Sequence, residues 1–125
     1  MNRASENGAL PTEMLCKVCG LTRPEDVALC HCLGVDFTGF IFARQSPRFV
    51  EPRVVAALPQ GPAQRVGVFV QANLATIQNT AQEAKLDLVQ LHSGEEVDFC
   101  RAVGPERVIK VLWPENLWPE AWNPE

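Results

Sequence analysis

Apolar and polar residues alternate in blocks along the chain, and the blocks predict strands and helices in regular succession. Short runs rich in Val, Ile, Leu and Phe, bounded by glycine and polar residues, predict five strands, over residues 14–19, 36–42, 65–70, 88–91 and 107–112. Helix signals fill the intervals and predict helices over residues 22–33, 51–58, 74–85 and 95–103. Strands that alternate with helices indicate a parallel sheet covered by helices.

Residues that start and stop helices support this division. Thr22 is the expected N-cap of the first helix, with Pro24 in its first turn and Glu25 as the acidic residue of a capping box. Asn73 is the expected N-cap of the third helix. Gly34 is expected to end the first helix.

Two α/β architectures fit the succession of elements. One is a five-stranded doubly wound sheet, and the other is a (β/α)8 TIM barrel truncated after its fifth strand. A complete barrel usually needs about 200 residues or more, whereas this sequence has 125. The expected organisation is a flexible N-terminal extension over 1–13, a β/α unit over 14–112, and a tail over 113–125 that is rich in Trp and Pro.

Composition narrows the class of protein. The net charge of -4 argues against a nucleic-acid-binding domain, which is usually basic. No apolar run approaches the ~20 residues that span a membrane. The first thirteen residues are polar and lack the apolar core of a signal peptide, so the cytoplasm is the expected location.

The five cysteines admit two interpretations. Buried small apolar side chains are the ordinary role for unpaired cysteines. A zinc site built from Cys16, Cys19, Cys30 and Cys32 is the alternative, suggested by one C-x-x-C spacing. That site is disfavoured because residues three apart on a strand, and two apart on a helix, point in different directions.

Candidate functional side chains cluster where strands end. Cys19 ends the first strand, and Lys17 shares its face, where an ammonium lowers the pKa of a neighbouring thiol. Arg48, in the loop after the second strand, could hold a carboxylate or phosphate in a bidentate pair. Gln90 and His92 end the fourth strand on one face. Lys110 lies in the apolar fifth strand, either inside a barrel or extending to solvent.

Five ordered blocks together resemble the phosphoribosylanthranilate isomerase family of tryptophan biosynthesis. They are Lys17-Val18-Cys19-Gly20-Leu21-Thr22-Arg23-Pro24-Glu25-Asp26, Gly39-Phe40-Ile41-Phe42 with Ser46-Pro47-Arg48-Phe49-Val50, Arg65-Val66-Gly67-Val68-Phe69-Val70, Leu88-Val89-Gln90-Leu91-His92, and Val108-Ile109-Lys110-Val111. The family fold is a β/α barrel, so the resemblance favours the second architecture.

The resemblance also implies a reaction and its site. The family catalyses the Amadori rearrangement of N-(5-phosphoribosyl)anthranilate to 1-(2-carboxyphenylamino)-1-deoxyribulose 5-phosphate, without metal or cofactor. A general acid protonates the ring oxygen, the furanose opens to an imine-like species, and a base removes the proton from sugar carbon 2. The resemblance implies Cys19 as the base, Arg48 at the anionic substrate, most plausibly its carboxylate, and Gln90 and His92 along the pocket.

The sequence departs from the family pattern in two ways. His92-Ser93-Gly94 stands where the family usually has His-Gly. The family's general acid, an aspartate after strand six, and its phosphate loops after strands seven and eight have no counterpart among the 125 residues. The expectation is therefore an isomerase portion that is inactive alone, with self-association or a complementing C-terminal half-barrel as partner. The alternative is a non-catalytic α/β half-barrel that serves in binding or assembly.

Overall fold

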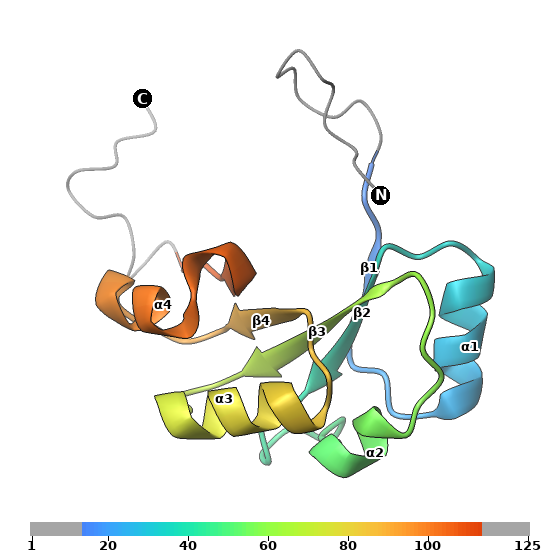
Figure 1. The fold of residues 1–125 in the computed structure, drawn as a ribbon, viewed down its shortest axis with the longest axis horizontal. Coiled ribbons are helices and arrows are strands. Elements are labelled where there is room, and N and C mark those ends of the chain that lie inside the picture. The colour runs from blue at the N-terminus through green and yellow to red at the C-terminus, as the bar shows by residue number, and fades with distance from the viewer. Residues whose placement is uncertain (1–13, 114–125) are drawn as a thin grey trace.

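A computed structural model describes residues 14–113 and shows one parallel β-sheet with helices packed against it (Figure 1). The predicted extension over 1–13 and, except for its first residue, the predicted tail over 113–125 lie outside the described residues. In chain order the elements are β1 (Lys17–Val18), α1 (Pro24–Cys32), β2 (Phe37–Ile41), α2 (Pro52–Ala56), β3 (Gln64–Phe69), α3 (Leu74–Glu83), β4 (Leu88–Leu91), α4 (Val97–Val103), the 3-10 turn η1 (Pro105–Arg107) and β5 (Val108–Lys110).

The strand order settles the architecture. Neighbours in the sheet follow the chain, β1-β2-β3-β4-β5, and every pair is parallel. A doubly wound sheet reverses its strand order at a switch point, whereas a β/α barrel adds each strand beside the last. Figure 1 shows the four helices following one another along the sheet in that same order. The arrangement is that of part of a β/α barrel, as predicted.

The strand register separates two faces of the sheet. Residues paired across strands share a face, and alternate residues along a strand lie on opposite faces. One face, which we call the helix-facing face, includes Phe40, Phe69, Val89 and Leu91, each at most 2% exposed. They pack with apolar residues of the helices and loops, among them Val27, Val55 and Ile77. Burying each such side chain contributes about 1.5–3 kcal/mol to folding.

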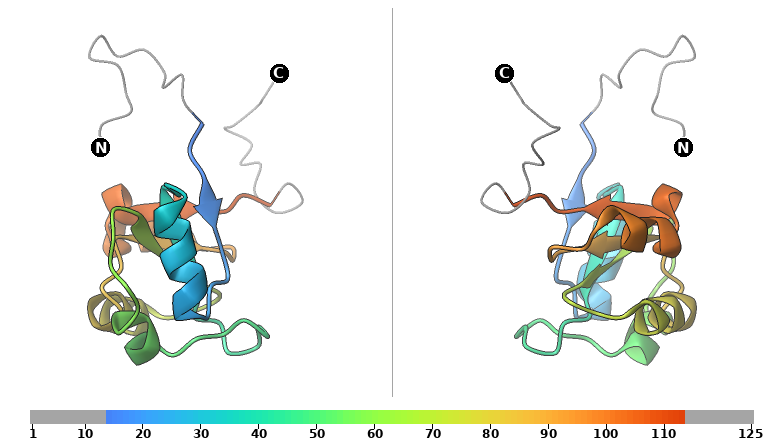
Figure 2. Two further views of the ribbon diagram at one scale, coloured as in Figure 1. Left: turned by 90° about the vertical axis from the view of Figure 1, so that its right-hand side faces the viewer. Right: turned by 90° about the vertical axis from the view of Figure 1, so that its left-hand side faces the viewer.

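The other face, which we call the concave face, carries a smaller apolar cluster. Its buried members are Ile41, Ala43 and Val68, with Cys19 and Val70 packed against them. The two opposite side views of Figure 2 show that the sheet curves, with its helices on the outer side of the curve. The helix-free face is therefore the inner side of a curved sheet.

One buried charge lies on the helix-facing face. Arg65 is 5% exposed, and its guanidinium donates to the carbonyl oxygens of Ala84 and Leu58, each at 2.9 Å. Its backbone N–H donates to Asp87 Oδ2 at 2.8 Å. Burial lowers the pKa of Arg65, and the nearby Asp87 carboxylate opposes that shift. Arg65 therefore joins β3 to the ends of α2 and α3.

The predicted first helix start is wrong by one residue. The N-cap is Arg23 rather than Thr22, and no side chain caps the helix. The reason is Pro24, because a proline restricts the residue before it to extended backbone, and Arg23 has φ −123° and ψ 139°. Arg23 instead pairs with Asp26 at 2.9 Å. The prediction for Asn73 is confirmed, since its side chain accepts from the N–H of Thr76 at 2.8 Å.

The predicted first strand is too long. Only Lys17 and Val18 pair with β2, while Met14 and Leu15 are exposed. The N–H of Cys16 donates to Asp36 Oδ2 at 2.8 Å instead of to a strand. Apolar residues at the start of the run thus lie outside the sheet because no strand lies beside them.

Candidate active site

The predicted site residues gather at the carboxyl end of the sheet. Cys19 follows β1, Arg48 lies in the loop after β2, and Gln90 and His92 are at the end of β4. Cys19 belongs to the cluster on the concave face, and Gln90 pairs with Val68 of that same cluster. Functional loops of β/α barrels lie at this end of the strands.

Cys19 is half-buried, and a glycine on the neighbouring strand makes room for it. A Cβ atom at Gly39 would lie 3.0 Å from Cys19 Sγ and 3.0 Å from its Cα. Larger side chains at residue 39 would therefore displace the thiol. Gly39 also accepts two N–H donors at its carbonyl, from Gly20 and Leu21, each at 3.0 Å. These bonds fix the turn that follows Cys19.

A second glycine brings Arg48 to Cys19. Gly20 has φ +81°, and a Cβ there would lie 2.3 Å from Arg48 Nη1. A residue with a side chain could neither adopt that backbone easily nor leave room for the guanidinium. Arg48 Nη1 donates to the carbonyl oxygen of Cys19 at 3.4 Å. The backbone N–H of Arg48 donates to Ser46 Oγ at 3.2 Å, which orders the loop.

Gln90 contacts a strand that is not its neighbour. Lys17 Nζ donates to Gln90 Oε1, so β1 and β4 meet across the concave face. In a flat sheet these strands would be about 14 Å apart, three spacings of about 4.8 Å. The contact therefore depends on the curvature of the sheet.

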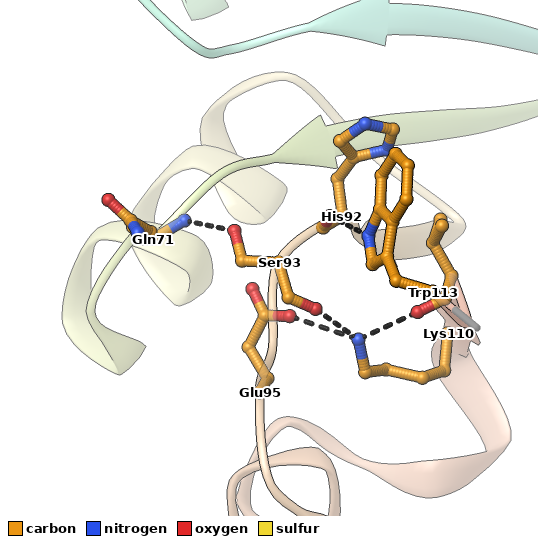
Figure 3. Close-up of polar contacts among 7 residues, drawn as sticks. Gln71, His92, Ser93, Glu95, Lys110 and Trp113 are labelled. Atoms are coloured by element: carbon orange, nitrogen blue, oxygen red, sulfur yellow. Dashed lines mark hydrogen bonds and ion pairs between the residues drawn. The ribbon is translucent and has the colours of Figure 1, made fainter. Parts of the chain in front are cut away.

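His92 lies at the corner between β4 and β5 (Figure 3). Its backbone N–H donates to the carbonyl of Phe69 at 3.0 Å, and its carbonyl accepts from Trp113 Nε1 at 2.9 Å. The imidazole and indole rings meet edge to face, with centroids 5.2 Å apart. The buried His92 Nδ1 has no hydrogen-bond partner among the described residues.

The residue after His92 links three strands. Ser93 Oγ accepts from the N–H of Gln71, which follows β3, at 2.9 Å. The carbonyl of Ser93 accepts from Lys110 Nζ of β5, and the same ammonium pairs with Glu95 at 3.2 Å (Figure 3). Ser93 is the departure from the family's His-Gly pattern, so that departure is a structural link rather than a loose insertion.

Lys110 is not inside the barrel. It pairs with Leu91, which is in the helix-facing core. Its ammonium also donates to the carbonyl of Val111 at 2.9 Å, and the side chains of Lys110 and Glu95 are 20% and 9% exposed. Neither predicted orientation is observed, because Lys110 lies on the helix-facing side and its ammonium is bound by Ser93 and Glu95 instead of extending to solvent. Lys110 fastens the loop after β4 to β5.

The site is cationic. Arg48 contacts Cys19 and Lys17 lies on the same face of β1 as Cys19, and within residues 14–113 neither cation forms an ion pair with a carboxylate. The other buried thiol, Cys30, is in the helix-facing core, where burial raises its pKa. Two cationic side chains that are not paired with carboxylates favour the binding of an anionic ligand.

The zinc alternative gains no support from the geometry. Cys16 and Cys32 are exposed, Cys30 is buried, and all five cysteines are unpaired. Within the part of the chain that the structure describes, no three His, Cys, Asp or Glu side chains gather as metal ligands do. No helix within the same residues is long and apolar enough to cross a membrane.

Sequence reasoning located the strand ends and missed the contacts between them. It did not assign roles to Gly39, to Ser93, or to the pairing of Lys17 with Gln90. For Gly39 a signal existed, since a lone glycine inside a strand often marks a close approach. The contacts of Lys17 and of Ser93 join residues that are distant in sequence, and no local sequence pattern predicts them.

Comparison with known proteins gives one consistent family. The family model for N-(5'phosphoribosyl)anthranilate (PRA) isomerase matches residues 16–118. The N-(5'-phosphoribosyl)anthranilate isomerase of Maridesulfovibrio salexigens is 48% identical over 103 residues, which are 82% of this chain and 50% of that protein.

Solved structures agree. The crystal structure of phosphoribosyl anthranilate isomerase from Thermus thermophilus superposes with a TM-score of 0.73 at 36% identity, covering 78% of this chain and 50% of that one. A phosphoribosyl anthranilate isomerase in complex with reduced 1-(o-carboxyphenylamino)-1-deoxyribulose 5-phosphate gives a TM-score of 0.71 at 35% identity, covering 78% and 53%. The chain spans about half the length of the relatives it matches.

Proposed function

The chain belongs to the N-(5'-phosphoribosyl)anthranilate isomerase family, and from that premise we propose that it provides the base and the carboxylate site for the Amadori rearrangement of N-(5-phosphoribosyl)anthranilate. The observation that carries the proposal is the contact of Arg48 with the Cys19 carbonyl, because it brings residues that follow two different strands side by side. A thiol and a guanidinium from different loops then face one ligand.

Each residue has a distinct chemical role in this proposal. The Cys19 thiolate removes the proton from sugar carbon 2, a step for which a positioned base contributes about 10²–10⁴-fold. Arg48 pairs in a bidentate manner with the anthranilate carboxylate. Gln90 and His92 line the pocket and hydrogen-bond the sugar. Arg48 is exposed and unpaired with any described carboxylate, so it is free to receive the ligand.

The rest of the machinery is assigned to strands beyond β5. The family resemblance gives the general acid to the end of a sixth strand and the phosphate site to later loops. β1 and β5 are the edges of the described sheet, and edge strands offer unpaired backbone groups to further strands. We therefore assign to this chain a complementing C-terminal half-barrel as its partner, whether carried on the same polypeptide or on another, in the cytoplasm, where unpaired cysteines are usual.

Turnover of the full chain, alone and mixed with a C-terminal half-barrel carrying strands six to eight, tests the proposal. We expect turnover in the mixture. The Cys19→Ser variant should reduce kcat at least 100-fold. The Arg48→Ala variant should raise KM more than it lowers kcat, because Arg48 binds the carboxylate, a group that does not react. Cys32→Ser, at an exposed cysteine of α1, is the matched control and should leave turnover unchanged.

Two results would contradict the proposal. One is full turnover by Cys19→Ser in the mixture, which would remove the cysteine from catalysis. The other is a folded chain that associates with the half-barrel and yet gives no turnover, which would favour the non-catalytic assembly module.

A further inference from the structure

Lys17 is a cationic side chain whose placement the reaction scheme above does not use. It precedes Cys19 by two residues and so lies on the same face of β1. Its ammonium crosses the concave face to Gln90 of β4. An ammonium carries three donors, and the contact with Gln90 occupies one of them.

The ammonium of Lys17 and the side chain of Cys19 both approach the same part of the concave face. Lys17 Nζ donates to Gln90, which pairs with Val68 in the register of β3 and β4. Cys19 packs against the cluster that contains Val68. Both side chains are therefore connected to Val68, one through Gln90 and the other by packing.

The partner of Lys17 is a neutral amide. Within residues 14–113 the ion pairs involve Arg23, Arg44, Arg101 and Lys110, and Lys17 is in none of them. A side-chain amide positions the ammonium without neutralising it. A positive charge kept in place in this way favours an oxygen atom on which negative charge develops.

Building on the proposed function, we propose that Lys17 is a further catalytic residue, which donates a hydrogen bond to the oxygen on sugar carbon 2, with Gln90 as its positioning residue. The sulfur of Cys19 acts at carbon 2, and the hydroxyl oxygen on that carbon is one bond away. A donor on the same face of the sheet as the sulfur is therefore available to that oxygen.

The proton transfers balance without any further reagent. The Cys19 thiolate takes the proton from carbon 2, the C–H electron pair becomes a double bond between carbons 1 and 2, and the electron pair of the protonated imine moves to nitrogen. The resulting enol then gives its hydroxyl proton to solvent while the Cys19 thiol returns a proton to carbon 1, which yields the ketone and restores the thiolate. Lys17 stays protonated, and its hydrogen bond to the oxygen stabilises the charge that the oxygen acquires.

The test compares two ligands by calorimetry, using the full chain mixed with the complementing half-barrel. One ligand is reduced 1-(o-carboxyphenylamino)-1-deoxyribulose 5-phosphate, which has a hydroxyl on carbon 2, and the other is the same compound without that hydroxyl. We expect Lys17→Met to weaken binding of the first about tenfold or more, as for one charge-assisted hydrogen bond, and to leave binding of the second unchanged. Lys17→Arg should recover part of the difference.

Controls separate this inference from the function beneath it. Lys85→Met removes a lysine that lies beyond α3 and should affect neither ligand. If the unsubstituted mixture binds neither ligand, the proposed function fails. If it binds both and Lys17→Met weakens them equally or not at all, the proposed function stands and the role of Lys17 is overturned. In the turnover assay, Lys17→Met should lower kcat and also raise KM, because the substrate carries the same hydroxyl on carbon 2.

Discussion

The two faces of the sheet are built from the same strands and differ in what they contain. The helix-facing face is a continuous apolar core in which Phe40 and Leu91 are fully buried. The concave face has a small apolar cluster, and beside it lie Cys19, Lys17 and Gln90, which are half-buried or exposed. Adjacent residues of one strand, such as Phe40 and Ile41, thus contribute to different faces. Stability is concentrated on one face and chemistry on the other.

Reactive groups are tolerated on the concave face because few buried contacts depend on them. Cys19 touches the edge of its cluster, and Arg48 contacts it from an exposed loop. On the opposite face, the buried guanidinium of Arg65 donates to two carbonyls, whereas the buried hydroxyl of Thr38 has no hydrogen-bond partner among the described residues. The same parallel strands therefore provide a packed core on the helix-facing face. On the concave face they carry side chains that can change without loss of that core.

The largest expected effect is loss of the helix-facing core. Phe40→Ala should reduce the free energy of unfolding by about 3–5 kcal/mol, because it removes a ring with no exposed surface and leaves a cavity. Urea unfolding followed by circular dichroism measures the free energy of unfolding. If the alanine variant does not fold, Phe40→Leu should show a smaller loss of the same kind. Cys19→Ser on the concave face should change stability by less than about 1 kcal/mol. Equal losses from the two substitutions would contradict the division between faces.

An intermediate effect is expected at the buried charge. Arg65→Met keeps much of the side-chain volume but leaves the carbonyls of Leu58 and Ala84 without their donor. Each buried acceptor left unpaired costs about 1–3 kcal/mol. Arg65→Lys should recover only part of the loss, since one ammonium lacks the planar fork that reaches both carbonyls. Unfolding in urea again measures the free energy of unfolding. A methionine variant as stable as the parent would show that the two hydrogen bonds of Arg65 make no net contribution to stability.

The smallest expected effect is at the surface, away from both faces. The hydrogen bond from Arg23 lowers the pKa of Asp26, so the carboxylate stays charged to lower pH in the folded chain than in the unfolded one. The stabilisation is complete above the ordinary carboxyl pKa and is lost as pH falls through the lowered value. A carboxyl carbon titration by NMR should show a higher Asp26 midpoint in Arg23→Gln. An unchanged midpoint would contradict the pairing.

Local sequence was enough to locate most elements. Alternating blocks of apolar and polar residues predicted all five strands, and β4 begins and ends where expected. Asn73 caps α3 because its side chain bonds a donor three residues away, a contact that the sequence alone specifies. Thr22 failed as a cap because Pro24 imposed extended backbone on Arg23. The N-terminal part of the first predicted strand failed because strand pairing depends on a neighbour, not on the apolar character of the run.

The candidate site shows the same limit. Its residues were identified from strand ends and from a family resemblance, and their assigned roles remain predictions. The sequence spacing of these residues does not predict how they pack together. Their packing depends on Gly20, which leaves room for Arg48, and on Gly39, which leaves room for Cys19. Lys110 shows the limit most clearly, since the sequence offered the barrel interior or solvent, whereas in the structure its ammonium binds Ser93 and Glu95 on the helix-facing side.

The sequence by itself determined the order of strands and helices, the caps that depend on near neighbours, and the family, because these follow from periodicity and from motifs within a few residues. Only the tertiary structure decided that Lys17 meets Gln90, that Ser93 joins β3 to β5, and which face receives each side chain. These contacts join residues far apart in the chain. The Ser93 contacts exist because β3 and β5 both lie beside β4, and the contact of Lys17 with Gln90 exists because the sheet curves, which is a property of the packed sheet as a whole.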